Sequence, residues 1–319
     1  MLAHPLGLTA DNAAALVEAV LAGAPTATVA ADAGIDAVDL DVAVQTYRIA
    51  GTAALLKVHD DQWFHAYVEP SDWETAEEVL ARELAPRLEH LDGGRARWWF
   101  LRKHPHWRLR VHISNHRTVE ATLDLLVAMR HIAGWRPGVY EPEQAAFGGP
   151  TGMAIAHDLF CADSRGLLAH SRVDPAPNGR HQLSLLLIRT LQHHAGLDWY
   201  EIGDVFAKVA QMRPAPGAAD HPIIGRLAVQ LRPLLALPDQ ARTGLFTAPG
   251  PHANAESWHD AYAVAGRRLA TAAAGLRLER GLRATIAQLV IFHWNRIGLS
   301  AHAQTVLAHA ATTTILPRS

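Results

Sequence analysis

The stretch from residue 107 to residue 113 carries the clearest chemical pattern in this chain. It reads Trp-Arg-Leu-Arg-Val-His-Ile, and polar and apolar residues alternate without a break. Because successive side chains of a strand point to opposite faces, Arg108, Arg110 and His112 share one face. Two guanidinium groups two residues apart suit a ligand with two anionic groups, since each can bind a carboxylate or phosphate through two hydrogen bonds. A half-buried strand with a solvated polar face explains the same periodicity.

A second candidate is His293, in a helix expected from about residue 280 to residue 298. His293 lies three residues after Val290 and four before Ile297, so it falls on the apolar stripe of that helix. A satisfied core histidine is the first interpretation. The second is a general base, because an imidazole next to Arg296 could take a proton while the cation holds an anion.

Residues 140–150 predict an irregular segment. They read Tyr-Glu-Pro-Glu-Gln-Ala-Ala-Phe-Gly-Gly-Pro, and the two prolines and the glycine pair exclude a regular helix or strand. The glycines could let the backbone approach a ligand closely. An ordinary connecting loop is the alternative. A helix is expected from Met153 to Phe160, and Asp163 and Ser164 could then cap the next helix.

Composition limits the classes of partner and cofactor. The 319 residues include 49% hydrophobic and 19% charged residues, and the formal net charge of −2 favours neither nucleic acid nor an anionic membrane surface. The single cysteine, Cys161, excludes an internal disulfide framework and a cysteine zinc site. The 20 histidines show no His-Glu-x-x-His or other ligand spacing. We therefore expect no metal and no cofactor.

The sequence also shows no membrane or secretion segment. No apolar run reaches the roughly 18 residues that a membrane span requires. Residues 1–8 lack a basic segment followed by an apolar core, so they do not resemble a signal peptide. These observations predict a soluble protein of the cytoplasm.

The periodicities predict an α+β fold. Residues 62–69 are rich in aromatic and β-branched residues and predict a strand. A helix with an apolar stripe from Ala76 to Leu88 follows it. Residues 98–103 then predict a second strand, which turns at 104–106 into the Arg108 strand. A strand, a helix and a hairpin in this order favour a mixed or antiparallel sheet with helices on one face.

Helical spacing covers the remaining parts of the chain. An amphipathic helix is expected over residues 118–133, and from about residue 150 onward the pattern is mainly helical. Residues 9–56 predict a small helical extension that resembles a helix-turn-helix in outline. DNA binding is not expected, because Arg48 is the one Lys or Arg before Gly51 and phosphate contacts need several. A docking role fits the extension better.

Five short motifs occur in one order within about residues 60–315. They are Trp98-Trp99-Phe100-Leu101-Arg102, then Trp107-Arg108-Leu109-Arg110, then Tyr140-Glu141-Pro142-Glu143 with Phe147-Gly148-Gly149, then Asp163-Ser164, and finally Phe292-His293-Trp294-Asn295-Arg296. Together they resemble the thiopeptide-type bacteriocin biosynthesis family, the stand-alone relatives of the C-terminal elimination domain of lantibiotic dehydratases. The arginine and histidine motifs are specific in combination and weak singly.

The resemblance implies two chemistries. In lantibiotic dehydratases, a Ser or Thr of a precursor peptide is esterified with glutamate from glutamyl-tRNA, and the elimination domain expels the glutamate to leave a dehydroamino acid. In thiopeptide pathways, a related protein joins two dehydroalanines by a formal aza-cycloaddition, forms a pyridine ring and expels the leader peptide. Elimination needs fixed cations for two carboxylates and a base for the Cα proton, and the residues of this chain favour it.

Carried over position by position, the resemblance implies roles for individual residues. Arg108 and Arg110 match the arginines that hold the glutamyl group, and His293 matches the histidine of the elimination site. We expect the motif residues Phe147, Gly148, Gly149, Asn295 and Arg296 to contribute to substrate binding. His112, which shares the face of the two arginines, is expected to contribute as well.

The chain departs from the family at the aromatic-Gly-Gly motif. Eliminating members usually carry an arginine just before it, where this chain has Ala146, and the aromatic residue is Phe147 rather than tyrosine. Arg102 or Lys103 could replace the missing cation at the substrate. An even-length hairpin loop would place Lys103 on the face of the two arginines, and an odd-length loop would place Arg102 there.

We therefore expect a lyase that eliminates glutamate from glutamylated Ser or Thr of a ribosomally made precursor peptide with a leader. A pyridine-forming cyclase and a non-catalytic docking subunit of a split dehydratase are the alternatives. Residues 58–319 would form the lyase domain. Residues 1–57 would dock the leader peptide or a separate glutamylating dehydratase subunit. The oligomeric state stays open, with a homodimer as one candidate.

Overall fold

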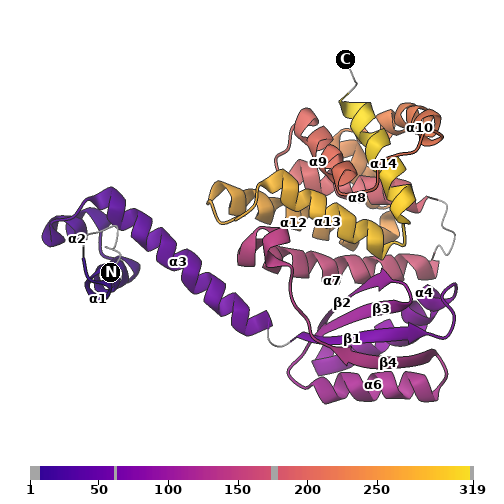
Figure 1. Cartoon of the computed structure of the whole chain (residues 1–319), viewed down its shortest axis with the longest axis horizontal. Helices are drawn as coiled ribbons and strands as arrows, with labels where there is room; N and C mark the ends of the chain where they lie inside the picture. Colours follow the sequence, from indigo (N-terminus) through magenta and orange to yellow (C-terminus); the bar gives the residue numbers. More distant parts are fainter. Residues whose placement is uncertain (1–7, 61–62, 174–178, 317–319) are drawn as a thin grey trace. The chain divides into compact units, whose positions relative to one another are not determined.

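A computed structural model describes residues 8–60, 63–173 and 179–316 of the chain (Figure 1). The interpretation that residues 1–8 form no signal peptide therefore falls almost entirely outside the described residues. The chain divides into two compact units, Met1–His59 and Asp60–Ser319.

The first unit is a small helical bundle. Its helices are α1 (Ala10–Leu21), α2 (Thr26–Ala33) and α3 (Ala37–Asp60). Gly34 ends α2 in the left-handed conformation, at φ +66°, which glycine adopts without strain. The bundle has its own buried apolar core, formed by Val17, Ala30, Leu40 and Val44. The predicted helical N-terminal extension is confirmed.

The second unit begins with a four-stranded antiparallel sheet. The strands are β1 (Trp63–Pro70), β2 (Arg97–Lys103), β3 (His106–His112) and β4 (Ile132–Gly138), in the order β2-β3-β1-β4. Between β1 and β2 the chain forms α4 (Ala76–Val79), a π-helical turn (Leu80–Leu84) and α5 (Ala85–His90). Helix α6 (His116–Ala128) connects β3 to β4. This β-α-β-β-α-β order is that of ferredoxin-like folds.

The two faces of the sheet differ as the alternation of residues 107–113 predicts. Trp107, Leu109 and Val111 are buried in the apolar core. On that side, Trp135 of β4 donates a hydrogen bond to Asp124 of α6 at 2.9 Å, which holds the helix against the sheet (Figure 1). The opposite side carries the arginines of β3 and is called the open face below. It has no helix of the α4–α6 segment upon it.

Strand β4 corrects the expectation of a helix over residues 118–133. The helix ends at Ala128, and the chain returns along β1 as a strand. Two glycines and Pro137 made this strand hard to predict, because both residue types are rare in the interior of sheets. At the edge of a sheet they are tolerated. Gly138 is also needed there, since a Cβ at that position would lie 2.5 Å from Cε2 of Tyr67.

The rest of the unit is helical. Helix α7 (Gly149–Val173) lies between the sheet and the remaining helices (Figure 1). These are α8 (Arg180–His194), α9 (Trp199–Gln211), α10 (Asp220–Leu235), α11 (Asp239–Phe246), α12 (Glu256–Ala274), α13 (Leu282–Arg296) and α14 (Ala301–Ile315). The α+β prediction is confirmed. Asp163 and Ser164 lie buried in the middle of α7, so the prediction that they cap a helix is wrong.

The described residues contain neither a membrane-spanning helix nor a cluster of metal ligands. Among the residues that the structure describes, no helix is long and apolar enough to cross a membrane. The same residues contain no cluster of three or more His, Cys, Asp or Glu side chains that could hold a metal ion.

Two helical glycines should respond to alanine in opposite directions. A Cβ on Gly152 of α7 would lie 1.8 Å from the carbonyl oxygen of Phe147, whereas a Cβ on Gly225 of α10 would meet nothing within 4 Å. We expect Gly152→Ala to lower the melting temperature. Gly225→Ala should raise the free energy of unfolding by up to about 1 kcal/mol, because alanine favours a helix. Thermal unfolding of both variants checks this, and a stable Gly152→Ala protein would contradict it.

Candidate active site

The arginines of β3 lie beside side chains of β1 and β4 on the open face. Cross-strand pairing places Arg110 opposite His65 and Arg108 opposite Tyr67. Tyr67 in turn lies opposite Arg136 of β4. Residues directly opposite each other in a sheet share a face and lie in contact distance. The open face therefore alternates cations with a histidine and a tyrosine across the strands.

Arg110 is the buried cation of this face. It is 6% exposed, and its guanidinium carbon lies 4.3 Å from the ring centroid of Trp99 and 5.3 Å from that of Tyr140. Burial lowers the pKa of Arg110 to about 10, so it stays a cation at neutral pH. Its Nε has no hydrogen-bond partner among the described residues. A buried, unpartnered donor of this kind is costly, and an anionic ligand would satisfy it.

Tyr67 lies between the two other arginines. The guanidinium carbon of Arg136 is 3.9 Å from the Tyr67 ring centroid, and that of Arg108 is 5.7 Å away. Arg108 is half-buried and Arg136 is exposed. Within the described parts of the chain, neither arginine nor Arg110 forms an ion pair with an acidic side chain. Sequence reasoning missed Arg136, because residues 132–138 were not recognised as a strand.

The hairpin between β2 and β3 decides which basic residue joins this face. Its loop has two residues, since Lys103 pairs with His106. Lys103 accordingly lies on the open face, at its exposed end, and Arg102 lies on the other side. There Arg102 forms an ion pair with Glu77 of α4, which Arg180 of α8 also contacts. Burial alone would raise the pKa of Glu77, but the two arginines lower it to about 2.

Two further histidines, His112 and His157, lie on the side of the open face where β2 and β3 pair. His112 is opposite Trp63, with ring centroids 5.2 Å apart. His157 of α7 lies 4.7 Å from the same tryptophan ring, and its Nε2 is 2.6 Å from the hydroxyl of Tyr140. Burial lowers the pKa of His157 to about 3, so it is neutral at pH 7. The rings of His112, His157 and Trp63 thus pack together at one end of the open face, where Tyr140 of the segment after β4 contacts His157.

A third histidine, His65, was also missed by sequence reasoning. Its signal was present, because residues 63–68 alternate in the same way as residues 107–112 and place His65 with Tyr67. His65 is 4% exposed, and its Nδ1 lies 2.9 Å from the carbonyl oxygen of Val139.

His293 lies elsewhere, in a buried hydrogen-bond network of the helical half. It is 2% exposed. Its Nδ1 lies 2.9 Å from Oδ1 of Asp163, and its Nε2 lies 2.9 Å from Oγ of Ser184. Trp258 and Tyr262 of α12 each donate a hydrogen bond of 2.8 Å to the same carboxylate. Both ring nitrogens of His293 therefore contact groups of the protein.

Ser184, His293 and Asp163 have the connectivity of a catalytic triad. None of the three is more than 2% exposed, and the indole N–H of Trp294 donates to the serine Oγ at 3.1 Å. A nucleophile must reach its substrate, so in this arrangement the three side chains hold α7, α8 and α13 together. Acid–base catalysis by His293 stays a prediction, and it requires a conformation in which a substrate reaches the ring.

Arg296 connects this network to the sheet. It is fully buried, and it donates to the Asp163 carboxylate and, at 3.0 Å, to the carbonyl of Phe100. The N–H of Phe100 donates to Ser164 Oγ at 3.2 Å. Because β2 is an edge strand, these side chains satisfy backbone groups that no neighbouring strand can reach. Asn295 accepts a hydrogen bond of 2.8 Å from a glutamine of α14.

The aromatic-Gly-Gly motif forms a turn against the segment before α13. Phe147 is fully buried, with rings of α7 and α13 centred about it at 5.3 and 4.9 Å. Gly148 and Gly149 have φ values of +86° and +82°, a conformation that favours glycine. A Cβ on Gly149 would lie 2.4 Å from Cδ of Glu279. In this structure the close approach that the glycines allow is to the protein itself.

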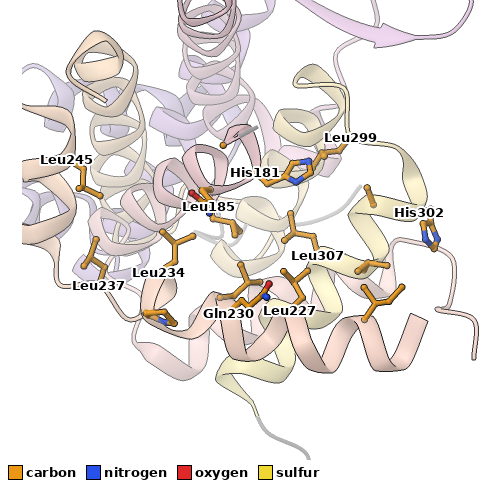
Figure 2. Close-up of a pocket in the computed structure, with 17 residues that line it drawn as sticks. His181, Leu185, Leu227, Gln230, Leu234, Leu237, Leu245, Leu299, His302 and Leu307 are labelled. Atoms are coloured by element: carbon orange, nitrogen blue, oxygen red, sulfur yellow. The ribbon is translucent and has the colours of Figure 1, made fainter. Parts of the chain in front are cut away.

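A separate groove of about 810 Å³ lies among α8, α10 and α14 (Figure 2). Neither Arg108, Arg110 nor His293 lines it. Its walls are mainly leucines, with histidine and glutamine between them, and Figure 2 labels Leu185, Leu227, Leu234, Leu307, His181 and Gln230 among them.

Removing the charge of Asp163 should destabilise the fold strongly. Burial alone would raise the pKa of Asp163, but His293 and Arg296 hold it below its ordinary value. Asp163→Asn would leave Arg296 as a buried charge without a counterion, at a cost of roughly 3–5 kcal/mol. Asp158→Asn is the matched control on the same helix, because that aspartate forms half-exposed ion pairs worth about 1 kcal/mol or less. Equal losses in urea unfolding would contradict the assignment.

Two solved structures share the fold. MibB, a tRNA dependent lantibiotic dehydratase from Microbispora sp. 107891, superimposes with a TM-score of 0.58 and 17% identity, over 79% of this chain and 28% of MibB. TsrL superimposes with a TM-score of 0.56 and 15% identity, over 79% of this chain and 93% of TsrL. The chain thus spans 28% of the length of MibB and nearly all of TsrL.

The family assignment rests on a sequence model. No curated protein matches the chain. The model described as "Lantibiotic biosynthesis dehydratase C-term" matches residues 63–315, which includes β1 and the whole of α14. The protein therefore belongs to the lantibiotic biosynthesis dehydratase C-terminal family, which acts in the biosynthesis of ribosomally made, modified peptides.

Proposed function

We propose that the protein is a lyase that eliminates glutamate from glutamylated Ser or Thr residues of a ribosomally made precursor peptide. The observation that supports this proposal best is the pair of arginines on β3. Arg108 and Arg110 share the open face, and neither forms an ion pair within the described residues. Two unpaired guanidinium groups on adjacent positions of one face match a substrate that presents two carboxylates.

The glutamyl ester supplies these two groups at different stages. Its free carboxylate is present in the substrate, and the half-buried Arg108 is suited to hold it. The second carboxylate forms only when the ester oxygen leaves. Arg110 lies in a buried, aromatic environment, where a fixed cation stabilises a developing negative charge more strongly than in water. The pair therefore binds the substrate and favours departure of glutamate.

The reaction itself is a β-elimination. A base removes the proton from Cα of the glutamylated residue, and the electron pair of that bond forms the Cα=Cβ double bond. The Cβ–O bond breaks, and its electrons leave with glutamate as a carboxylate. No oxidant or metal is required, so the protein has to supply a base, cations and orientation.

Arg136 favours elimination over pyridine formation. Eliminating members of the family usually carry an arginine where this chain has Ala146, and the absence of that arginine is the argument for a cyclase. Arg136 supplies a third guanidinium on the same face, 3.9 Å from the Tyr67 ring that separates it from Arg108. Lys103 adds a fourth cation at the exposed end. The face is thus rich in cations without an arginine before the Gly-Gly pair.

We predict that Arg108→Lys and Arg110→Lys each allow glutamylated peptide to accumulate. Lysine keeps the charge but cannot form the two-point contact of a guanidinium, so elimination should slow by about 100-fold or more. Mass spectrometry of a glutamylated precursor peptide measures retained glutamyl groups. Arg97→Lys is the matched control, because Arg97 lies on β2 in a surface ion pair with Asp158. Wild-type elimination by both β3 variants would refute the assignment.

The same assay separates the two chemistries. A precursor peptide with two preformed dehydroalanines should remain unchanged if the protein is a glutamate lyase. Loss of the leader peptide with formation of a pyridine ring would instead establish the cyclase.

The N-terminal unit is proposed to dock the leader peptide. Helix α3 exposes Val38 and Val42, one helical turn apart, and Ile49 continues the same stripe. Exposed apolar side chains at this spacing are typical of helix–helix contacts. We predict that Val38→Ser with Val42→Ser weakens binding of a fluorescent leader peptide by about tenfold or more. Turnover of a leader-free glutamylated substrate should not change.

The matched control for that variant is Asp39→Ser with Asp41→Ser. Both aspartates are exposed on α3 but lie off the apolar stripe. Fluorescence anisotropy measures leader affinity for all three proteins. Identical affinities for the valine variant and the wild type would exclude docking through this stripe.

A further inference from the structure

His65 lies at the centre of the open face, between Arg110 on one side and Gly138 on the other. The glycine leaves room for the ring, because a Cβ there would lie 3.1 Å from the Nδ1 atom of His65. The neighbouring row of the sheet holds Arg108, Tyr67 and Arg136. His65 is therefore an imidazole placed among Arg108, Arg110 and Arg136, the first two of which are the proposed partners of the substrate carboxylates.

One hydrogen bond determines the state of the ring. Nδ1 of His65 lies 2.9 Å from the carbonyl oxygen of Val139, and a carbonyl can only accept. Nδ1 therefore carries the proton, and Nε2 carries the lone pair. Among the described residues, Nε2 is buried and has no hydrogen-bond partner. An orphaned acceptor in a nonaqueous site is costly unless a ligand uses it.

Burial lowers the pKa of His65 to about 4, and the charges of Arg110, Arg108 and Arg136 act in the same direction. The ring is consequently neutral at pH 7 and able to accept a proton. Carboxylates bound to these arginines would offset their charge and strengthen the base once the substrate is in place. Binding of the substrate carboxylates therefore makes His65 a stronger base.

We propose that Nε2 of His65 takes the Cα proton of the glutamylated residue. This inference rests on the proposed elimination. The Cα–H bond breaks and its proton binds Nε2, the electron pair forms the Cα=Cβ bond, and glutamate leaves as a carboxylate toward Arg110. His293 is less suited to this step, because both of its ring nitrogens contact the protein.

The cover of the site is the irregular segment after β4. It supplies the Val139 carbonyl that orients His65, and it places the Tyr140 ring over Arg110. The Tyr140 and His65 ring centroids are 6.5 Å apart. Because Nε2 is buried, a peptide reaches it only by displacing neighbouring side chains, and Tyr140 is the ring of this segment that lies beside His65.

The test is His65→Asn. The asparagine amide can still donate to Val139, but it offers no basic nitrogen at the Nε2 position. Elimination from a glutamylated peptide should fall by about 100-fold or more in kcat, with little change in KM. His106→Asn is the matched control, because His106 lies on the same face at its outer end, beside Lys103, and should retain wild-type rates.

The outcomes of this experiment distinguish the role of His65 from the proposed function. Near-wild-type elimination by folded His65→Asn would overturn the inference and leave the proposed function intact. No elimination by the wild type would overturn both. If His65→Asn does not fold, nitrogen-15 NMR of the wild type at pH 7 replaces it. A His65 ring protonated only on Nδ1 supports the proposal, and a proton on Nε2 refutes it.

Discussion

The carboxylate of Asp163 holds the larger unit together. It lies in the middle of α7 with 1% of its surface exposed, and it receives hydrogen bonds from Trp258 and Tyr262 of α12 and from His293 and Arg296 of α13. A buried charge is tolerated only when its desolvation is offset by such donors. Because the donors come from two other helices, this one anion joins α7 to both α12 and α13.

Arg296 extends that arrangement to the sheet. Its contact with the carbonyl of Phe100 seals the edge of β2, and its guanidinium carbon lies 5.9 Å from the ring centroid of Trp99. Arg110 contacts the same indole from the open face at 4.3 Å. Arg110 and Arg296 thus both lie beside the ring of Trp99, but they differ in whether an acidic side chain neutralises them. Arg296 is neutralised by Asp163, whereas Arg110 has no acidic side chain in an ion pair with it among the described residues.

Local periodicity accounts for what could be predicted from the sequence. The alternation around Arg108 and Arg110 defined a strand and its polar face. The length of the hairpin loop was not fixed by the sequence, so the choice between Arg102 and Lys103 stayed open until the pairing of Lys103 with His106 placed Lys103 on that face. Strand β4 could not be recognised, because Gly134 and Pro137 contradict the propensities of a strand and only its edge position permits them. Position in a sheet is a tertiary property.

The roles of buried polar groups also depend on tertiary contacts that the sequence does not reveal. A histidine on an apolar stripe fits either a core or a catalytic site, and the sequence does not reveal that the ring of His293 contacts Asp163, 130 residues away along the chain. His65 illustrates the reverse case. Its alternation with Tyr67 was visible in the sequence, but the state of its ring was not. The carbonyl of Val139, just after β4, contacts Nδ1, and Nε2 is left without a hydrogen-bond partner among the described residues.

The composition of β4 has a consequence for self-association. This strand forms one border of the sheet, and the other border, β2, is sealed by side chains of α7 and α13. Pro137 has no N–H to offer, and the glycines of β4 weaken its extended conformation, so a strand from a second copy would find an incomplete template there. Pairing of β4 with a strand of a second copy is therefore disfavoured, and the composition of this edge protects the sheet from growing by the addition of strands.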